Sequence, residues 1–213
     1  MLKRILTFSL FVMLVSLQSQ AQDKTIQLID PVTGADNPVR IACELRRSYR
    51  SFTEGEIRQD HLATLVWMAC GENRPDEHKR TVPSARNAQE IELYVFTKDG
   101  VYKYIPGKHL LNLVTPGDHR AKISQQEFFA QAPIALVLVA NYDKMKDFDA
   151  ASRDFYAAVD CGYVSQNIYM FCAASDLYGT VACGAINRDA ISTLLKIKNG
   201  KVMLAHPVGH VQH

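Results

Sequence analysis

The sequence lacks the short motifs that mark the common metal and nucleotide sites. Its five cysteines include no CxxC pair and no Cys/His cluster with the spacing of zinc ligands. Neither GxGxxG nor GxxxxGK followed by Ser or Thr occurs, which excludes the usual glycine-rich phosphate loops. Repeats and low-complexity tracts are absent too. One domain is therefore expected, with no metal site.

An excess of charge of one sign is also missing. The chain has 24 Lys and Arg against 22 Asp and Glu. Two of the basic residues, Lys3 and Arg4, precede an apolar segment, and the rest of the chain is balanced. A neutral surface gives no electrostatic attraction to nucleic acid or to anionic membranes. Neither is an expected partner.

Long hydrophobic runs are confined to the first residues. The apolar run from Ile5 to Leu17 follows a basic start, and Ser19-Gln20-Ala21 places small residues where a signal peptidase cleaves. The run is too short to span a bilayer comfortably, and no second one follows. We expect residues 1–21 to be a signal peptide and the protein to be exported, periplasmic or secreted, with no stable membrane anchor. An uncleaved anchor is the alternative.

The cysteines all lie in apolar stretches. A free cysteine in such surroundings behaves as a small buried hydrophobic residue. Export permits disulfides, but an odd number leaves at least one thiol unpaired. All five are expected in the core, with their disulfide state open: Cys43, Cys70, Cys161, Cys172 and Cys183.

The order of the expected elements indicates the fold class. After an irregular lead-in at 22–40, the domain covers 41–213. Apolar spacing predicts a helix over 62–70 with Asp60 as N-cap and Gly71 as stop, and a long helix over 153–175. The other expected elements are strands at 90–97, 101–104, 134–140 (buried on both faces), 180–186 and 201–208, and a short helix at 190–195. This irregular order, with a hairpin turn at Asp99-Gly100, favours an α+β domain with a mixed, mainly antiparallel sheet flanked by helices.

Three clusters carry chemistry. Arg46-Arg47-Ser48-Tyr49-Arg50, expected just before a helix, suits a phosphate dianion because guanidinium groups bind phosphate oxygens in pairs. The segment 81–89 is a loop rich in turn residues that leads into a strand. In 179–186, two glycines and small neighbours allow a flat ligand to approach the backbone. Taken separately, each cluster has an ordinary explanation. The first could be a solvated basic turn, the second an ordinary connecting loop, and the third a place where a helix and a strand pack closely.

Together and in this order, the clusters resemble the nitroreductase family. The resemblance covers roughly residues 41–209 and is closest to the branch of thiazole- and oxazole-forming dehydrogenases. The segments that carry it are Arg46–Arg50, Leu65–Arg74, Arg80–Ser84, Asp160–Tyr169 and His206–Gly209.

The resemblance implies an FMN cofactor and a homodimer with the site at its interface. The arginines and serine of the first cluster would hold the phosphate, ribityl chain and pyrimidine edge. The second cluster would pack on the flavin from the other subunit, and a main-chain N–H of the third would face N5. The implied cofactor-binding residues are Arg46, Arg47, Ser48, Arg50, Pro83, Ser84, Ala85, Arg86, Asn87, Cys183, Gly184 and Ala185.

Two positions depart from the family pattern. Members commonly carry Lys or Arg after the Val-Gly pair, where this chain has His210, which is mostly neutral at pH 7 and substitutes only partly. Arg86 stands where a small residue is usual beside the flavin. Both bear on FMN affinity and on the room left for a substrate.

The implied activity is ping-pong hydride transfer through flavin N5 between a small-molecule electron donor and acceptor. The cofactor performs the chemistry, so no catalytic acid or base is expected from the chain. Export separates the protein from the cytoplasmic NAD(P)H pool. One alternative is therefore an exported flavin-dependent dehydrogenase or oxidase that does not use NAD(P)H. Another is a non-catalytic ligand-binding member that has lost FMN.

The leader makes a testable prediction about the mature protein. Cleavage after Ala21 gives a chain that begins at Gln22. N-terminal sequencing of protein isolated from the cell envelope should find that end. An intact Met1 in that fraction would contradict cleavage and export together.

Overall fold

The computed structural model describes residues 26–28 and 37–212. One compact unit spans residues 35–213. The expected signal peptide and most of the lead-in lie outside the described residues, so the structure does not test them. Within the described ranges, no helix has the length and apolar character needed to cross a membrane.

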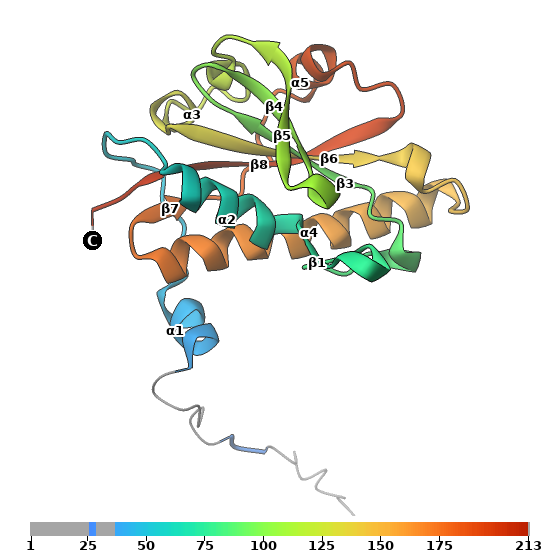
Figure 1. Ribbon diagram of the computed structural model, residues 1–213, viewed down its shortest axis with the longest axis horizontal. Coiled ribbons are helices and arrows are strands. Elements are labelled where there is room, and N and C mark those ends of the chain that lie inside the picture. The colour runs from blue at the N-terminus through green and yellow to red at the C-terminus, as the bar shows by residue number, and fades with distance from the viewer. Residues whose placement is uncertain (1–25, 29–36, 213) are drawn as a thin grey trace, which may run out of the picture. The chain divides into compact units, whose positions relative to one another are not determined.

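Figure 1 shows the order of the elements along the chain. The helices are α1 (Pro38–Leu45), α2 (Gln59–Cys70), α3 (Phe128–Gln131), α4 (Ala150–Ser175) and α5 (Arg188–Leu195). The strands are β1 (Glu72–Arg74), β2 (Lys79–Arg80), β3 (Ile91–Phe96), β4 (Gly100–Ile105), β5 (Leu110–Pro116), β6 (Ile134–Asn141), β7 (Tyr178–Thr180) and β8 (Gly200–His210).

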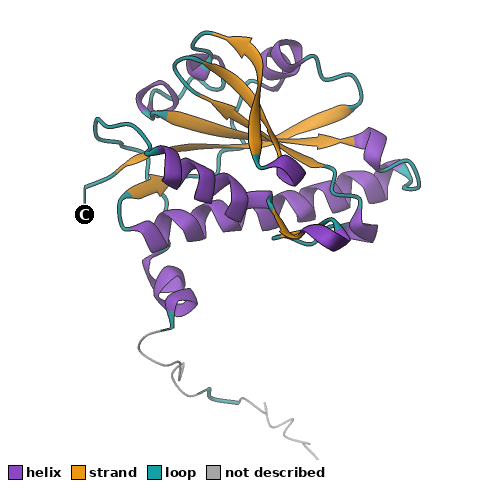
Figure 2. Cartoon of the chain, in the orientation of Figure 1, coloured by secondary structure: helices purple, strands orange, loops and turns teal. Residues whose placement is uncertain are grey.

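The main sheet has six strands in the order β5-β4-β3-β6-β8-β7, and every neighbouring pair is antiparallel. Helices α2 and α4 cover one face and α3 and α5 lie on the other, which gives three layers (Figure 2). Strands β1 and β2 form a separate small hairpin. The predicted α+β class with a mainly antiparallel sheet is confirmed.

The two central strands show why the sheet is buried on both faces. In β3, Leu93 and Val95 join the core under α2 and α4, whereas Tyr94 and Phe96 join the core under α3 and α5. This alternation follows from the two-residue period of a strand. Strand β6 divides its residues in the same way, as the continuous apolar run at 134–140 predicted.

Helix α1 is the main element that the sequence interpretation missed. Its N-cap Asn37 accepts hydrogen bonds from the N–H groups of Val39 and Arg40, and Pro38 occupies the first turn. The irregular lead-in therefore ends before 40, and the arginine cluster directly follows a helix. The expectation that Cys43 is buried is wrong, because it lies on an exposed side of this short helix.

Two further predicted boundaries are wrong for local reasons. The strand expected at 180–186 ends at Thr180, because the next amides turn to other partners: Ala182 N–H donates to the Tyr169 hydroxyl. Asp60 is not the N-cap of α2. Its carboxylate instead accepts from the guanidinium of Arg58, which occupies the cap position.

Candidate functional site

The arginine cluster runs in an extended conformation beside β7. Tyr49 N–H donates to Thr180 O at 2.9 Å, which ties the segment to the sheet. Successive side chains of an extended segment point to opposite sides. Arg46 and Ser48 accordingly meet α4 on one side, whereas Arg47 and Tyr49 lie on the other.

Tyr169 of α4 joins the first and third clusters. Its hydroxyl accepts from Ala182 N–H at 2.8 Å and lies 2.9 Å from Ser48 Oγ. The guanidinium of Arg46 stands over its ring, 5.3 Å from the centroid. Burial raises the pKa of Cys183, and the charge of Arg50 opposes that shift, so Arg50 acts on the segment that follows β7. The structure thus brings Arg46 and Ser48 to Tyr169, next to that segment.

Gly184 and Ala185 present unused backbone donors next to this group. Both residues are exposed, and among the described residues neither N–H donates a hydrogen bond. Their carbonyls are fixed, since Gly184 O accepts from Arg188 and Ala185 O accepts from Ser124. A Cβ at Gly184 would meet only Leu204, at 3.9 Å. The backbone here is held in place and open to a flat ligand.

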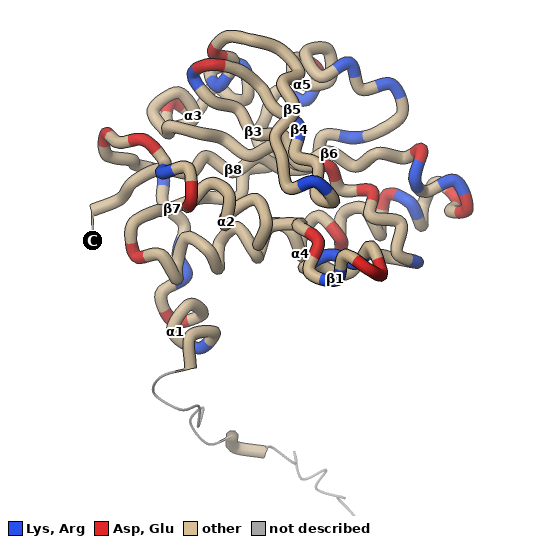
Figure 3. The backbone as a smooth tube through the Cα atoms, in the orientation of Figure 1, with Lys and Arg blue, Asp and Glu red and all other residues tan. Residues whose placement is uncertain are grey.

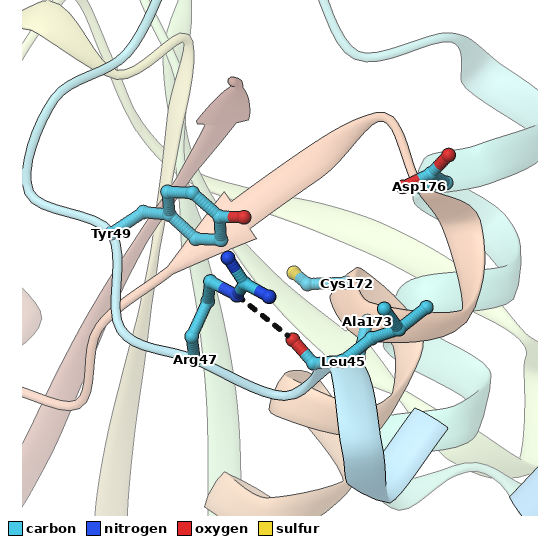
Figure 4. A pocket seen from close by; sticks show the side chains of 6 residues that line it. All are labelled: Leu45, Arg47, Tyr49, Cys172, Ala173 and Asp176. Carbon is cyan, nitrogen blue, oxygen red and sulfur yellow. Dashed lines mark hydrogen bonds between the residues drawn. The ribbon is translucent and has the colours of Figure 1, made fainter. Parts of the chain in front are cut away.

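Arg47 has a different environment from its neighbours. Figure 4 shows its side chain and that of Tyr49 facing a cavity of about 30 Å³ beside the C-terminal end of α4. Arg47 Nε donates to Leu45 O at 3.4 Å. The Tyr49 ring lies so close to Gly179 that a Cβ there would be 2.6 Å from it. Arg47 therefore faces this cavity, whereas Arg46 stands over the ring of Tyr169.

The loop of the second cluster is anchored at the other half of α4. Ala85 N–H donates to the Asp160 carboxylate at 2.9 Å, and Gln89 N–H donates to Ser84 Oγ at 2.9 Å. Arg86 donates to Asp147 O and stacks on Phe148, with 4.7 Å from its guanidinium to the ring centroid. Arg86, Asn87 and Gln89 all have positive φ, between 51° and 56°. Contacts to α4 and its preceding loop hold this strained turn.

The two halves of the expected site do not meet within one chain. Asp160 holds the loop and Tyr169 holds the arginine cluster, and nine residues of α4 separate them. A rise of 1.5 Å per residue places them roughly 13 Å apart along the axis. About two and a half turns also put them on opposite sides of the helix.

Exposed apolar side chains follow the same helix. Tyr156, Val159 and Tyr163 recur at helical spacing with exposures of 40%, 36% and 45%, and Phe155 beside them is 63% exposed. Asp160, next to Val159 in the same helix, is buried. No residue of the described ranges covers this apolar stripe of α4.

A pair of buried carboxyl groups lies beneath the loop. Glu90 is fully buried, Asp160 is 3% exposed, and neither Glu90 oxygen has a donor among the described residues. Burial, and then the neighbouring Asp160, raises the pKa of Glu90 to about 7. A protonated Glu90 can donate a hydrogen bond to the Asp160 carboxylate, which already accepts one from Ala85 N–H. Sequence analysis did not identify this pair.

A buried histidine supports the other half. His206 Nε2 lies 2.8 Å from Ser165 Oγ, and Nδ1 lies 3.1 Å from Thr180 Oγ1. Thr180 donates its own proton to Pro207 O, so it accepts from Nδ1–H and Ser165 donates to Nε2. Burial lowers the pKa of His206 to about 3, which keeps the ring neutral. The ring packs edge to face against Tyr169, with 5.4 Å between the ring centroids, and so supports the tyrosine from behind.

His210 also has a defined contact. Its Nε2 lies 3.0 Å from Glu56 O, and its ring packs against Tyr178 with centroids 4.7 Å apart. A Cβ at Gly55 would be 2.7 Å from the ring, so this close packing requires glycine there. The imidazole is therefore part of the packing between β8 and the segment that precedes α2.

Comparisons with known proteins agree with this geometry. A model of the nitroreductase family matches residues 44–210. A candidate nitroreductase of Methanocaldococcus jannaschii is 33% identical over 175 residues, covering 77% of this chain and 86% of that protein. The crystal structure of a candidate nitroreductase from Ralstonia eutropha matches with a TM-score of 0.78 and 29% identity, covering 88% of this chain and 90% of that one. A candidate nitroreductase from Desulfovibrio desulfuricans, solved in complex with FMN, shares the fold at a TM-score of 0.58 and 19% identity, covering 84% of this chain and 88% of that one.

The buried carboxyl pair predicts how stability depends on pH. The pKa of Glu90 rises from 4.5 to about 7 on folding, so the folded protein holds a proton that the unfolded chain releases. Stability from this group is fully present below about pH 4.5 and is lost as the pH rises through about 7. Glu90→Gln removes the titration, so its melting temperature should fall less between pH 5 and pH 8 than that of the wild type.

Differential scanning calorimetry at both pH values measures the difference. Glu77→Gln is the control, because Glu77 is exposed and its loss should leave the pH dependence unchanged. Equal slopes for the wild type and Glu90→Gln would show that Glu90 does not hold a proton in the folded state.

Proposed function

Because the chain belongs to the nitroreductase family, we propose that it is an FMN-dependent oxidoreductase. The observation that carries the proposal is that Arg46 and Ser48 contact Tyr169, whose hydroxyl also binds Ala182 N–H, two residues before Gly184. Among the described residues the N–H groups of Gly184 and Ala185 have no hydrogen-bond partner. The Desulfovibrio relative, whose structure contains FMN, supports the choice of cofactor.

The residues at this place fit the parts of FMN. Two guanidinium groups and a hydroxyl match a phosphate dianion, which binds best through charge-assisted hydrogen bonds. Gly184 has no side chain to keep a planar ring from the backbone, and the two amides next to it lack partners. An exposed donor pair on a fixed backbone suits a ring edge that accepts hydrogen bonds.

When bound, FMN would supply ping-pong hydride transfer through its N5 atom. The chain itself would bind and orient. Arg46 and Arg50 would neutralise the phosphate, Ser48 would bond the cofactor while Tyr169 holds its hydroxyl, and an N–H of Gly184 or Ala185 would face N5. No acid or base from the chain enters these steps.

A homodimer would complete the site. In one chain the loop of Pro83–Asn87 is held near Asp160, away from the arginine cluster, and the apolar stripe of Phe155, Tyr156, Val159 and Tyr163 is uncovered. A two-fold contact between these stripes would bury them and bring the loop of one subunit toward the arginines of the other. The family resemblance supports the same arrangement.

Export restricts the electron donor. If residues 1–21 are a signal peptide, the mature protein works away from the cytoplasmic NAD(P)H pool, so the donor would be another small molecule. The five motif segments taken together are most similar to the branch of thiazole- and oxazole-forming dehydrogenases, which remove a hydride from their substrate. A dehydrogenase or oxidase of an exported substrate is therefore the form of the activity that we favour.

One observation favours a second candidate, a ligand-binding protein that has lost FMN. His210 stands where the family commonly has a cation, and its ring is engaged with Glu56 and Tyr178. The visible spectrum of the purified protein separates the two. Flavin absorbance would support the oxidoreductase, and a colourless protein that ignores added FMN would support the binding protein.

The arginines give a prediction with a built-in control. A hydrogen bond to a charged group contributes about 1.5–3 kcal/mol, so Arg46→Ala or Arg50→Ala should weaken FMN binding roughly ten- to a hundredfold. Arg47→Ala should change it less than about threefold, because Arg47 faces the opposite side. Fluorescence quenching of FMN titrated into each apoprotein measures the affinities.

Riboflavin, which lacks the phosphate, separates a phosphate contact from a general loss of structure. Its affinity should be almost unaffected by all three substitutions. Equal losses for FMN and riboflavin would mean that these arginines stabilise the fold and do not bind phosphate.

The dimer makes a separate prediction. Burial of an apolar aromatic side chain is worth about 1.5–3 kcal/mol, so Tyr163→Glu should weaken dimerisation by tenfold or more and weaken FMN binding with it. Leu113→Glu is the control, since Leu113 is 57% exposed on the edge strand β5. Sedimentation velocity at micromolar concentration should find dimers for the wild type and the control. A monomeric wild type with FMN bound would contradict the proposal.

A further inference from the structure

A groove of about 500 Å³ lies between the β1–β2 hairpin and the loop that follows it. Its basic lining comes from Arg74, Lys79 and Arg80, and neutral polar groups come from residues such as Asn73 and Asn87. No acidic residue lines it. The groove is therefore positively charged and rich in hydrogen-bond donors.

The hairpin places two of these cations opposite each other. Arg74 and Lys79 are direct partners in the antiparallel register of β1 and β2. Like charges on directly opposed residues destabilise a hairpin. Neither forms an ion pair with any residue of the described ranges, although Asp76 and Glu77 occupy the turn between the strands. Figure 3 shows acidic and basic positions close together along the chain near β1. The pairing leaves a concentration of charge that an anion in the groove would neutralise.

Arg80 is the innermost of the three. Its Nη1 donates to Ile91 O at 3.2 Å, but its buried Nε has no partner among the described residues. Glu72 stands opposite Arg80 in the register, yet it forms no ion pair with it: its carboxylate approaches His78, with 3.9 Å between the nearest atoms. The pKa of the neighbouring Lys144 is lowered by burial first and then by the charge of Arg80. Arg80 thus adds a third cation to the groove, without an ion pair among the described residues.

The groove continues into the loop of the proposed flavin site. Pro83, Ser84 and Asn87 line it together with the three cations. These are the residues that the proposed function places on the flavin. A molecule that reached the cofactor past this loop would pass the cations.

We propose that this groove binds the anionic group of the enzyme's small-molecule substrate, and that the enzyme prefers organic anions over neutral compounds of the same shape. That the bound anion is a substrate rests on the proposed function. The positive groove itself does not depend on it. A carboxylate and a phosphate monoester share the required chemistry, since both present oxygens that guanidinium and ammonium groups bind.

Matched probes test the proposal on the full mature protein as purified. Isothermal titration calorimetry compares 4-nitrobenzoate with neutral 4-nitrobenzamide, and phenyl phosphate with benzoate. We expect 4-nitrobenzoate to bind at least tenfold more tightly than the amide. Arg74→Gln and Lys79→Ala should each weaken the binding of 4-nitrobenzoate about tenfold and leave the binding of the amide unchanged.

The control variant is Lys122→Ala, which removes an exposed cation that does not line the groove and should change neither affinity. Tighter binding of phenyl phosphate than of benzoate would assign the groove to phosphate monoesters, and the reverse order to carboxylates. Equal affinities for 4-nitrobenzoate and 4-nitrobenzamide in a protein that carries flavin would overturn the proposed anion site and leave the proposed function intact. A colourless protein that still binds 4-nitrobenzoate through Arg74 would overturn the proposed function and support the groove.

Discussion

The hydroxyl of Tyr169 is the contact on which the candidate site depends. A phenol has one proton and two lone pairs, and here it accepts from Ala182 N–H while it bonds Ser48 Oγ. Both partners lie outside regular strands, so no ladder of backbone hydrogen bonds fixes them to each other. Their relative position is set by this one side chain of α4 together with the hydrogen bond from Tyr49 N–H to Thr180 O. The neutral His206 ring behind Tyr169 prevents the phenol from moving toward the sheet.

Helix α4 also fixes the spacing of everything else. Because it is rigid, the loop held at Asp160 and the cluster held at Tyr169 keep a constant separation of roughly 13 Å. Exposed aromatic and apolar side chains lie on α4 on either side of the Asp160 anchor: Phe155, Tyr156, Val159 and Tyr163. Such a surface is costly for a helix that stays in water. In the proposed dimer, a second copy of the chain would relieve that cost and, by two-fold symmetry, would supply each half-site with its complement. One helix would then determine both the oligomer and the site.

The sequence predicted the elements whose signal is local. The apolar run at 134–140 became a strand buried on both faces, and the spacing from Leu62 to Cys70 became α2. Long-range contacts were not predictable. Thr180–Ile186 reads as a strand, but the partner that ends it is the Tyr169 hydroxyl. The three motif clusters were visible, yet nothing in their residue types showed that Arg47 faces away from Arg46. Helix α1 was predictable in principle from Asn37 and Pro38, a cap signal that the arginine cluster beside it obscured.

The costly features of the molecule gather at the same loop. Arg86, Asn87 and Gln89 adopt a left-handed conformation that costs each of them roughly 1 kcal/mol or more. Beneath them the structure buries Glu90 next to Asp160, where only one of the two carboxyl groups can be charged at low cost. A loop with no task beyond connecting a hairpin to a strand could avoid both costs with glycines and an amide side chain. That the chain retains them, and compensates with the stacking of Arg86 on Phe148, is what we expect of a loop whose shape is needed by a bound molecule.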